Sequence, residues 1–101
     1  MKRIILLAFL CTTTLVMAQR INHVQEAIAN YDYEAALTLI AKEKPTIPLL
    51  LQKGKAQRGL GMNTEALSTY QEIITNDTAN TRAYIEAAEC CRSLALSLIH
   101  I

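Results

Sequence analysis

Side chains that could perform catalytic or metal chemistry are sparse in this chain of 101 residues. It contains two histidines, His23 and His100, and an adjacent pair of cysteines, Cys90 and Cys91. Neither histidine stands at zinc-ligand spacing from that pair, and no nucleophile is accompanied by a base. We therefore predict that the protein is not an enzyme and has no metal site, no cofactor and no small-molecule substrate.

Three short motifs have structural explanations that we favour over chemical ones. Gly59-Leu60-Gly61 resembles half of a phosphate loop, but it follows a helical pattern and is explained by a reversal of the chain. Residues 76–79 contain a formal N-glycan sequon and a short O-glycan acceptor motif, and they are also a typical polar turn. Cys90 and Cys91 point about 100° apart on a helix and cannot bridge each other. They are small packing residues, or one of them is an exposed thiol that pairs with another chain.

The N-terminus has the three parts of a secretory signal peptide, which we place at residues 1–18. Lys2 and Arg3 precede a short apolar run, and Val16-Met17-Ala18 provides a small-residue exit. A retained anchor is the weaker alternative, and bulky residues before Cys11 argue against lipid attachment. Cleavage after Ala18 leaves 8 basic and 9 acidic residues, so there is no positive excess to attract nucleic acid. We expect an exported, periplasmic or cell-envelope protein that meets a membrane only through an uncleaved signal or a missing C-terminal part.

The remaining chain predicts helices separated by short turns, with no strand pattern. Apolar residues recur at steps of three and four from Ile21 onward. Asp32, Thr46 and Asn63 are predicted to cap the second, third and fourth helices, and a fifth begins near Thr81. The inward face of this fifth helix is expected to consist of Tyr84, Ala87, Ala88 and Cys91.

Gly54 is the most informative single residue of this pattern. Glycine within a helix costs about 0.5–1 kcal/mol relative to alanine, so a compensating contact is expected. Ala66, on the next helix, is small enough to face Gly54 directly. We therefore predict that the two helices touch at these two positions.

The bulky-then-small pair Leu50 and Gly54 recurs 34 residues later as Tyr84 and Ala88. This period, with Ala66 and Tyr70 on the intervening helix, resembles the tetratricopeptide repeat (TPR) family. The resemblance implies an all-α fold of antiparallel helix-turn-helix repeats stacked as a short right-handed solenoid. The helix-packing signature it implies is Leu50, Gly54, Ala66, Tyr70, Tyr84 and Ala88. A generic bundle of helical hairpins is the alternative.

On this resemblance the chain divides into a degenerate first hairpin (19–46), a good repeat (47–80), the first helix of a third repeat (81–95) and an anomalous tail (96–101). Thr78, Gln57 and Lys53 depart from the residues usual in the family. The tail lacks the turn and second helix that a repeat requires. It is explained by truncation, by docking on another chain or by a foreign sequence, since it resembles a translated sequencing adapter. We favour truncation.

The first helix of each repeat in this family lines a concave groove that holds a peptide. Helical spacing selects a matching set, with four cations, one anion and two aliphatic residues: Leu51, Lys55, Arg58, Arg82, Ile85, Glu89 and Arg92. Such a face suits a peptide or protein partner that carries carboxylates, although an ordinary solvated face has the same composition. We expect an exported interaction or scaffolding module. The alternative is the non-catalytic N-terminal repeat segment of a longer secreted or membrane-tethered protein.

Overall fold

The computed structural model describes residues 21–99, which form helices joined by short turns and contain no strand. A helical segment at residues 21–29 is followed by α2 (Tyr33–Ala41), α3 (Ile47–Gly59), α4 (Asn63–Asn76) and α5 (Thr81–Ile99). The all-α prediction is confirmed for this part of the chain. The predicted signal peptide, Cys11 and His100 lie outside the described residues.

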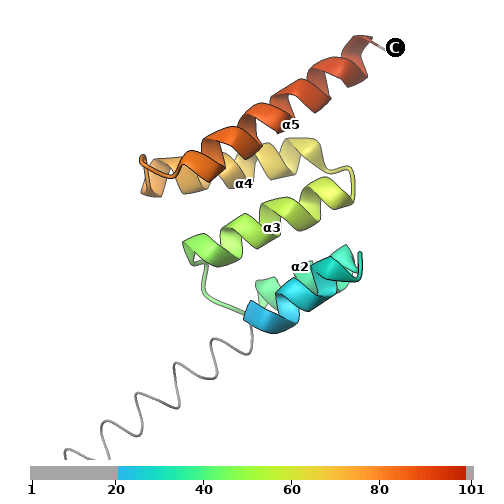
Figure 1. Ribbon diagram of the computed structural model, residues 1–101, viewed down its shortest axis with the longest axis vertical. Coiled ribbons are helices and arrows are strands. Elements are labelled where there is room, and N and C mark those ends of the chain that lie inside the picture. Colours follow the sequence, from blue (N-terminus) through green and yellow to red (C-terminus); the bar gives the residue numbers. More distant parts are fainter. Residues whose placement is uncertain (1–20, 100–101) are drawn as a thin grey trace, which may run out of the picture.

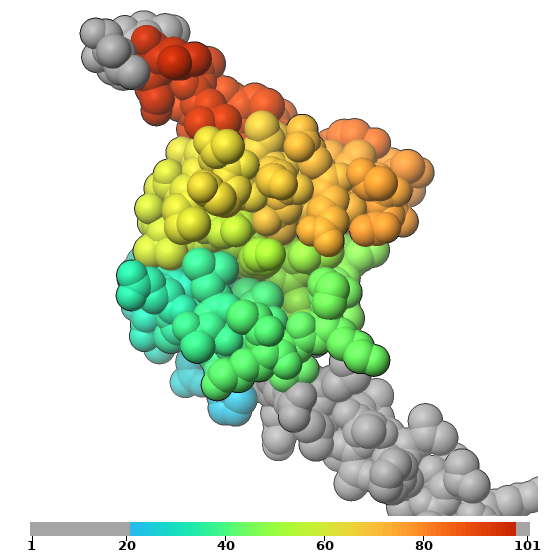
Figure 2. All heavy atoms as spheres, turned by 180° about the vertical axis from the view of Figure 1, so that it is seen from behind, coloured from blue at the N-terminus to red at the C-terminus, as the bar shows by residue number. Residues whose placement is uncertain are grey.

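Each labelled helix packs against the next one along the chain (Figure 1). Seen from behind, atoms of α2 and α4 cover much of the face (Figure 2). The C-terminal turns of α5 project beyond the other helices in both views. None of the helices within residues 21–99 is long and apolar enough to cross a bilayer.

Side-chain caps fix the beginnings of three helices. Asp32, Thr46 and Asn80 each accept a hydrogen bond from the backbone N–H three residues later, over 3.3, 3.4 and 3.1 Å. These bonds satisfy donors that have no partner within the first helical turn. The prediction for Asn63 was wrong, because Met62 is the capping residue of α4 and makes no side-chain cap bond. Asn63 is already the first residue inside the helix.

The two hairpin turns, after residues 21–29 and after α3, have the same backbone geometry. The N–H groups of Tyr31 and Gly61 donate to the carbonyl three residues earlier, each over 3.0 Å. The next residue in each turn donates to the carbonyl five residues earlier, over 2.8 and 2.9 Å. Both turns require a positive φ, which is 61° at Tyr31 and 78° at Gly61. Glycine adopts this conformation freely, whereas a tyrosine there costs about 1–2 kcal/mol.

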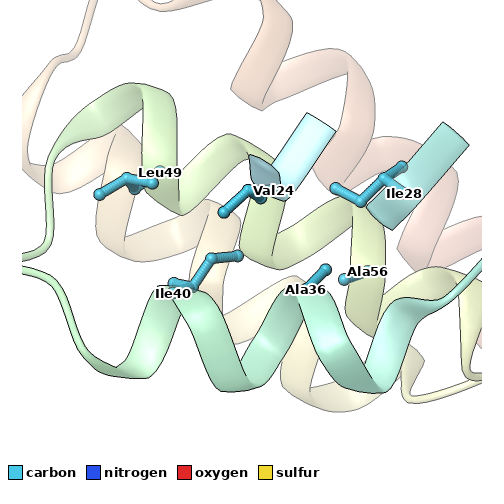
Figure 3. Packing of buried hydrophobic residues seen from close by; sticks show 6 residues of the cluster. All are labelled: Val24, Ile28, Ala36, Ile40, Leu49 and Ala56. Carbon is cyan, nitrogen blue, oxygen red and sulfur yellow. The ribbon is translucent and has the colours of Figure 1, made fainter. Parts of the chain in front are cut away.

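The first buried cluster joins the helical segment 21–29 to α2 and α3 (Figure 3). Its members are aliphatic or small, and consist of Val24, Ile28, Ala36, Ile40, Leu49 and Ala56. Ala36 and Ala56 have no exposed surface and lie close together in Figure 3. Their small side chains let the two helices approach each other closely.

The second buried cluster joins α3, α4 and α5. It consists of Leu50, Ala66, Tyr70, Ile73, Ala83 and Cys90. Because Leu49 belongs to the first cluster and Leu50 to the second, α3 is covered on two faces. This helix is the centre of the described structure.

Gly54 is buried at the interface of α3 and α4, but its neighbour differs from the predicted one. A Cβ built on Gly54 would lie 2.4 Å from Cζ of Tyr70, and the three nearest atoms all belong to that ring. Ala66 is buried in the same cluster without being the nearest contact. The glycine therefore makes room for a phenol ring that lies across α3, rather than for the backbone of the next helix.

The packing face of α5 differs in part from the predicted one, since Ala87 packs against the second cluster as predicted but the other three residues do not. Tyr84 is 48% exposed and Ala88 is exposed, whereas Ala83 and Cys90 have no exposed surface. Cys91 is exposed as well. In α3 the residues 34 positions earlier, Leu50 and Gly54, are buried because α4 packs over them. No helix covers that face of α5 among residues 21–99.

A buried polar contact between α3 and α4 was not foreseen from the sequence. Gln57 and Thr69 are 7% and 4% exposed, and the Thr69 hydroxyl lies 2.7 Å from Oε1 of Gln57. The same hydroxyl lies 3.1 Å from the carbonyl oxygen of Glu65. The contact gives the buried carbonyl of Gln57 a hydrogen-bond partner within the interface.

We predict that Thr69→Val lowers the free energy of unfolding by about 1–3 kcal/mol, because it leaves the buried amide of Gln57 without its partner. The measurement is urea denaturation followed by circular dichroism. In the background of Gln57→Leu, the same Thr69→Val change should cost much less, since both partners are then apolar. Equal costs in the two backgrounds would contradict the coupling.

Candidate groove between α3 and α5

A hollow of about 350 Å³ lies between α3 and α5. It is lined by Pro48, Leu51, Gln52, Lys55, Arg58, Tyr70, Arg82 and Glu86. The α3 residues among them recur at helical steps of three and four, as expected for one face of a helix. Arg82 and Glu86 are likewise four residues apart on α5. The groove is thus formed by two neighbouring helix faces, with Tyr70 reaching it from α4.

The structure brings together four of the seven residues predicted for this surface. Leu51, Lys55, Arg58 and Arg82 line the hollow. The other three, Ile85, Glu89 and Arg92, are not among its lining residues. Ile85 is 57% exposed, and Arg92 donates a hydrogen bond to Glu89 over 2.7 Å on the surface of α5.

Four lining residues were missed from the sequence. Pro48 and Gln52 lie four residues apart on the same face of α3, so helical spacing could have found them. Glu86 follows Arg82 by one turn, and the same rule would have selected it in place of Glu89. Tyr70 could not be found this way, because it belongs to α4 and its ring lies over Gly54 of α3.

Arg58 and Glu86 form an ion pair that crosses the groove from α3 to α5. Their side chains are 30% and 25% exposed, so the pair is partly shielded from water. Burial acts to lower the pKa of Arg58, but the hydrogen bond and charge of Glu86 outweigh it, and the net shift is upward. The Arg58 guanidinium is therefore committed to Glu86 and is less available to a ligand than the sequence suggested.

Tyr70 and Cys90 are buried within range of the charges of this ion pair. Burial raises the pKa of Tyr70 to about 12, with Glu86 adding to the shift and Arg58 opposing it. Burial also raises the pKa of the Cys90 thiol, and there Arg58 acts in the opposite direction. In both groups burial therefore disfavours the ionised form, which is the nucleophilic one.

Lys55 and Arg82 carry the charges that remain available in the groove. Both side chains are exposed, and neither forms an ion pair or side-chain hydrogen bond in the described structure. Together with Arg58 they make three cations against the single anion Glu86. The groove therefore has an excess of positive charge, on a chain whose total net charge is only +1.

A second hollow, of about 370 Å³, adjoins the first along α3. It is lined by Gln25, Ile28, Ala29, Tyr31, Tyr33, Gln52 and Lys55. Gln52 and Lys55 line both hollows, so the two form one longer depression across α3. Its end near residues 21–33 is aromatic, and its end at α5 is charged.

The groove combines apolar surface with exposed hydrogen-bond donors. Within residues 21–99, no group of three or more histidine, cysteine, aspartate or glutamate side chains is placed to hold a metal ion. His23 is exposed on the helical segment 21–29 and does not line the groove. What the lining residues offer a ligand is apolar surface from Leu51 and Pro48, and hydrogen-bond donors from Lys55 and Arg82.

Comparison with known proteins found no relative of this chain. No family model matches the chain, and neither a curated protein nor a solved structure matches it. The class that the fold and the groove define is therefore a coarse one, an all-helical protein of repeat-like hairpins. Any more specific assignment has to come from the residues themselves.

Proposed function

We propose that the chain is a TPR-like interaction or scaffolding module that is exported to the periplasm or cell envelope and binds a peptide or protein segment bearing carboxylates. Stacking of the hairpins as a short right-handed solenoid is part of this proposal. The repeated turn geometry at Tyr31 and Gly61 and the sequential packing of α2 to α5 support it.

The observation that carries the proposal is the pair of uncommitted cations in the groove. Lys55 and Arg82 flank the Arg58–Glu86 pair on two different helices, beside the apolar side chain of Leu51. A carboxylate bound by Lys55 or Arg82 forms charge-assisted hydrogen bonds, which contribute about 1.5–3 kcal/mol each. An acidic ligand that spans the groove could engage both.

We expect the double variant Lys55→Glu/Arg82→Glu to bind an acidic peptide at least tenfold more weakly than the unaltered chain. The probe is a fluorescein-labelled decapeptide of alternating glutamate and alanine, and the readout is fluorescence anisotropy at low salt. Tenfold corresponds to about 1.4 kcal/mol, less than the loss of one charged contact. The fold should persist, because both side chains are exposed.

Lys42→Glu/Lys44→Glu is the matched control, with the same change in net charge at exposed positions after α2. It separates groove contacts from the overall field of the protein. An equal loss of affinity in the control, or no binding of the glutamate peptide by the unaltered chain, would contradict the proposal. A version of the peptide with glutamine in place of glutamate should bind neither Lys55→Glu/Arg82→Glu nor Lys42→Glu/Lys44→Glu appreciably.

The second candidate function is a non-catalytic N-terminal repeat segment of a longer secreted or membrane-tethered protein. The observation that favours it is the exposed face of α5 at Tyr84 and Ala88, whose counterpart in α3 is covered by the following helix. Genomic DNA downstream of residue 95 distinguishes the two. A continuing frame with further repeats, a membrane span or another domain supports the second candidate, whereas an immediate stop supports the first.

A further inference from the structure

Tyr31 occupies a position where a tyrosine contributes little to the fold. The equivalent position in the other hairpin turn is Gly61, with the same hydrogen bonds and a similar positive φ. A side chain in this left-handed conformation is disfavoured, and glycine avoids that cost. The tyrosine gains little from burial in return, since it is 79% exposed.

Backbone strain at a residue that exposes a large aromatic side chain to solvent indicates a functional role for that side chain. The ring of Tyr31 is held in a defined direction by an edge-on contact with Tyr33, at 6.3 Å between centroids and 75° between planes. Tyr33 is itself partly buried, and its ring lies over Gly59 on α3. The exposed Tyr31 ring thus packs against a residue that is in contact with a neighbouring helix.

The position of Tyr31 relates it to the groove. It lines the second hollow together with Gln52 and Lys55, and those two residues also line the first hollow. A ligand that contacts Lys55 and extends into the second hollow therefore passes beside the Tyr31 ring. Aromatic rings provide apolar contact area at a small cost in conformational entropy, which is why tyrosine is enriched where proteins bind one another.

We propose that Tyr31 forms an apolar subsite of the groove, which accepts an aromatic or aliphatic side chain next to the carboxylates of the bound peptide. This inference rests on the proposed function and specifies the ligand class further. The ligand is then an extended acidic segment with a large apolar residue at one end, and not a uniformly charged one. The charges at Lys55 and Arg82 provide attraction, and Tyr31 provides selectivity.

The test uses three fluorescein-labelled peptides with the same four glutamates: one with phenylalanine at the N-terminal end, one with phenylalanine at the C-terminal end, and one with serine at both ends. We expect one of the phenylalanine peptides to bind the chain at least fivefold more tightly than the serine peptide. Tyr31→Gly should abolish this preference, by weakening the preferred phenylalanine peptide at least fivefold more than the serine peptide. Tyr31→Phe should retain the preference, because the ring is kept.

Tyr84→Ala is the matched control, since Tyr84 is also exposed but lies on α5 and lines neither hollow. It should leave the preference intact. Thermal melting supplies a second readout, in which Tyr31→Gly should melt at the same temperature as the unaltered chain or up to about 8 °C higher. A clearly lower melting temperature would mean that the tyrosine is retained for stability, and would overturn the inference.

The outcomes separate this inference from the proposed function. Equal binding of the phenylalanine and serine peptides, with the dependence on Lys55 and Arg82 preserved, overturns the Tyr31 subsite alone. An unchanged preference in Tyr31→Gly does the same. Failure of the chain to bind any of the glutamate peptides overturns both.

Discussion

Replacement of Tyr70 by alanine is expected to lower the free energy of unfolding by about 3–5 kcal/mol, the range measured for large aromatic residues in protein cores. Tyr70 is 1% exposed and joins α4 to α3 over Gly54. A small domain is stable by only about 5–15 kcal/mol, so this single change could unfold a large share of the molecules. Urea denaturation at low temperature measures the loss, and Tyr70→Leu provides a variant with a smaller cavity.

The same contact predicts that the effect of Gly54→Ala changes sign with the residue at position 70. In the unaltered chain the new Cβ would lie 2.4 Å from the Tyr70 ring, and that ring is enclosed. We expect a loss of about 1–3 kcal/mol, as is typical of overpacking. In the Tyr70→Ala background the space is free, and Gly54→Ala should instead stabilise the helix by about 0.5–1 kcal/mol. A cycle of the four proteins measures the coupling.

Gly59→Ala is the matched control for this cycle. Its Cβ would also lie 2.4 Å from a tyrosine ring, that of Tyr33, but Tyr33 is only half-buried. The ring can move toward solvent, so the loss should be smaller than at Gly54. Equal losses at the two glycines, or a Gly54→Ala effect that does not depend on Tyr70, would show that the buried ring is not what requires the glycine.

The second large effect is a loss of stability at alkaline pH that originates from Tyr70. Its pKa is about 12 in the folded chain, chiefly because of burial, compared with about 10 for an exposed tyrosine. Between these values the phenol ionises in the unfolded chain but stays protonated in the folded one. The stabilisation is therefore complete below pH 10 and is lost as the pH rises toward 12. At about 1.4 kcal/mol per unit, the loss amounts to about 2–3 kcal/mol.

Tyr70→Phe is the control for this pH dependence, because it keeps the ring and removes the ionisable group. Unfolding free energies measured in urea at pH 9, 10, 11 and 12 should fall less steeply in Tyr70→Phe than in the unaltered chain. Every other ionisable group is present in both proteins, so the difference between them isolates the contribution of Tyr70. Parallel curves for the two proteins would contradict the assignment to Tyr70.

Much of the local structure follows from short-range sequence rules. Apolar residues at steps of three and four predict the helices, and the hydroxyl of Thr46 and the carboxylate of Asp32 predict two of their beginnings. The prediction that Asn63 caps α4 was wrong because the backbone turn at Gly61 fixes where that helix begins. Met62 takes the capping position, and Asn63 lies one residue inside the helix, where its side chain is not needed for capping.

The site was predictable only as far as it depends on a single helix. Leu51, Lys55 and Arg58 share one face of α3, and all three line the groove. On α5 the choice between adjacent faces depended on which residues pack, and Ala83 and Cys90 pack where Tyr84 and Cys91 were expected. That shift of one residue rotates the helix by about 100°, so Glu86 enters the groove and Glu89 stays outside.

By itself the sequence determined that the described chain is all helix, where most helices begin, and that Gly54 needs a close neighbour, because these properties depend on residues a few positions apart. Only the tertiary structure decided that the neighbour is the Tyr70 ring, that Arg58 is paired with Glu86, and that Lys55 and Arg82 are left for a ligand. Those outcomes depend on the rotation of each helix against the next, and many residues fix that rotation together through packing.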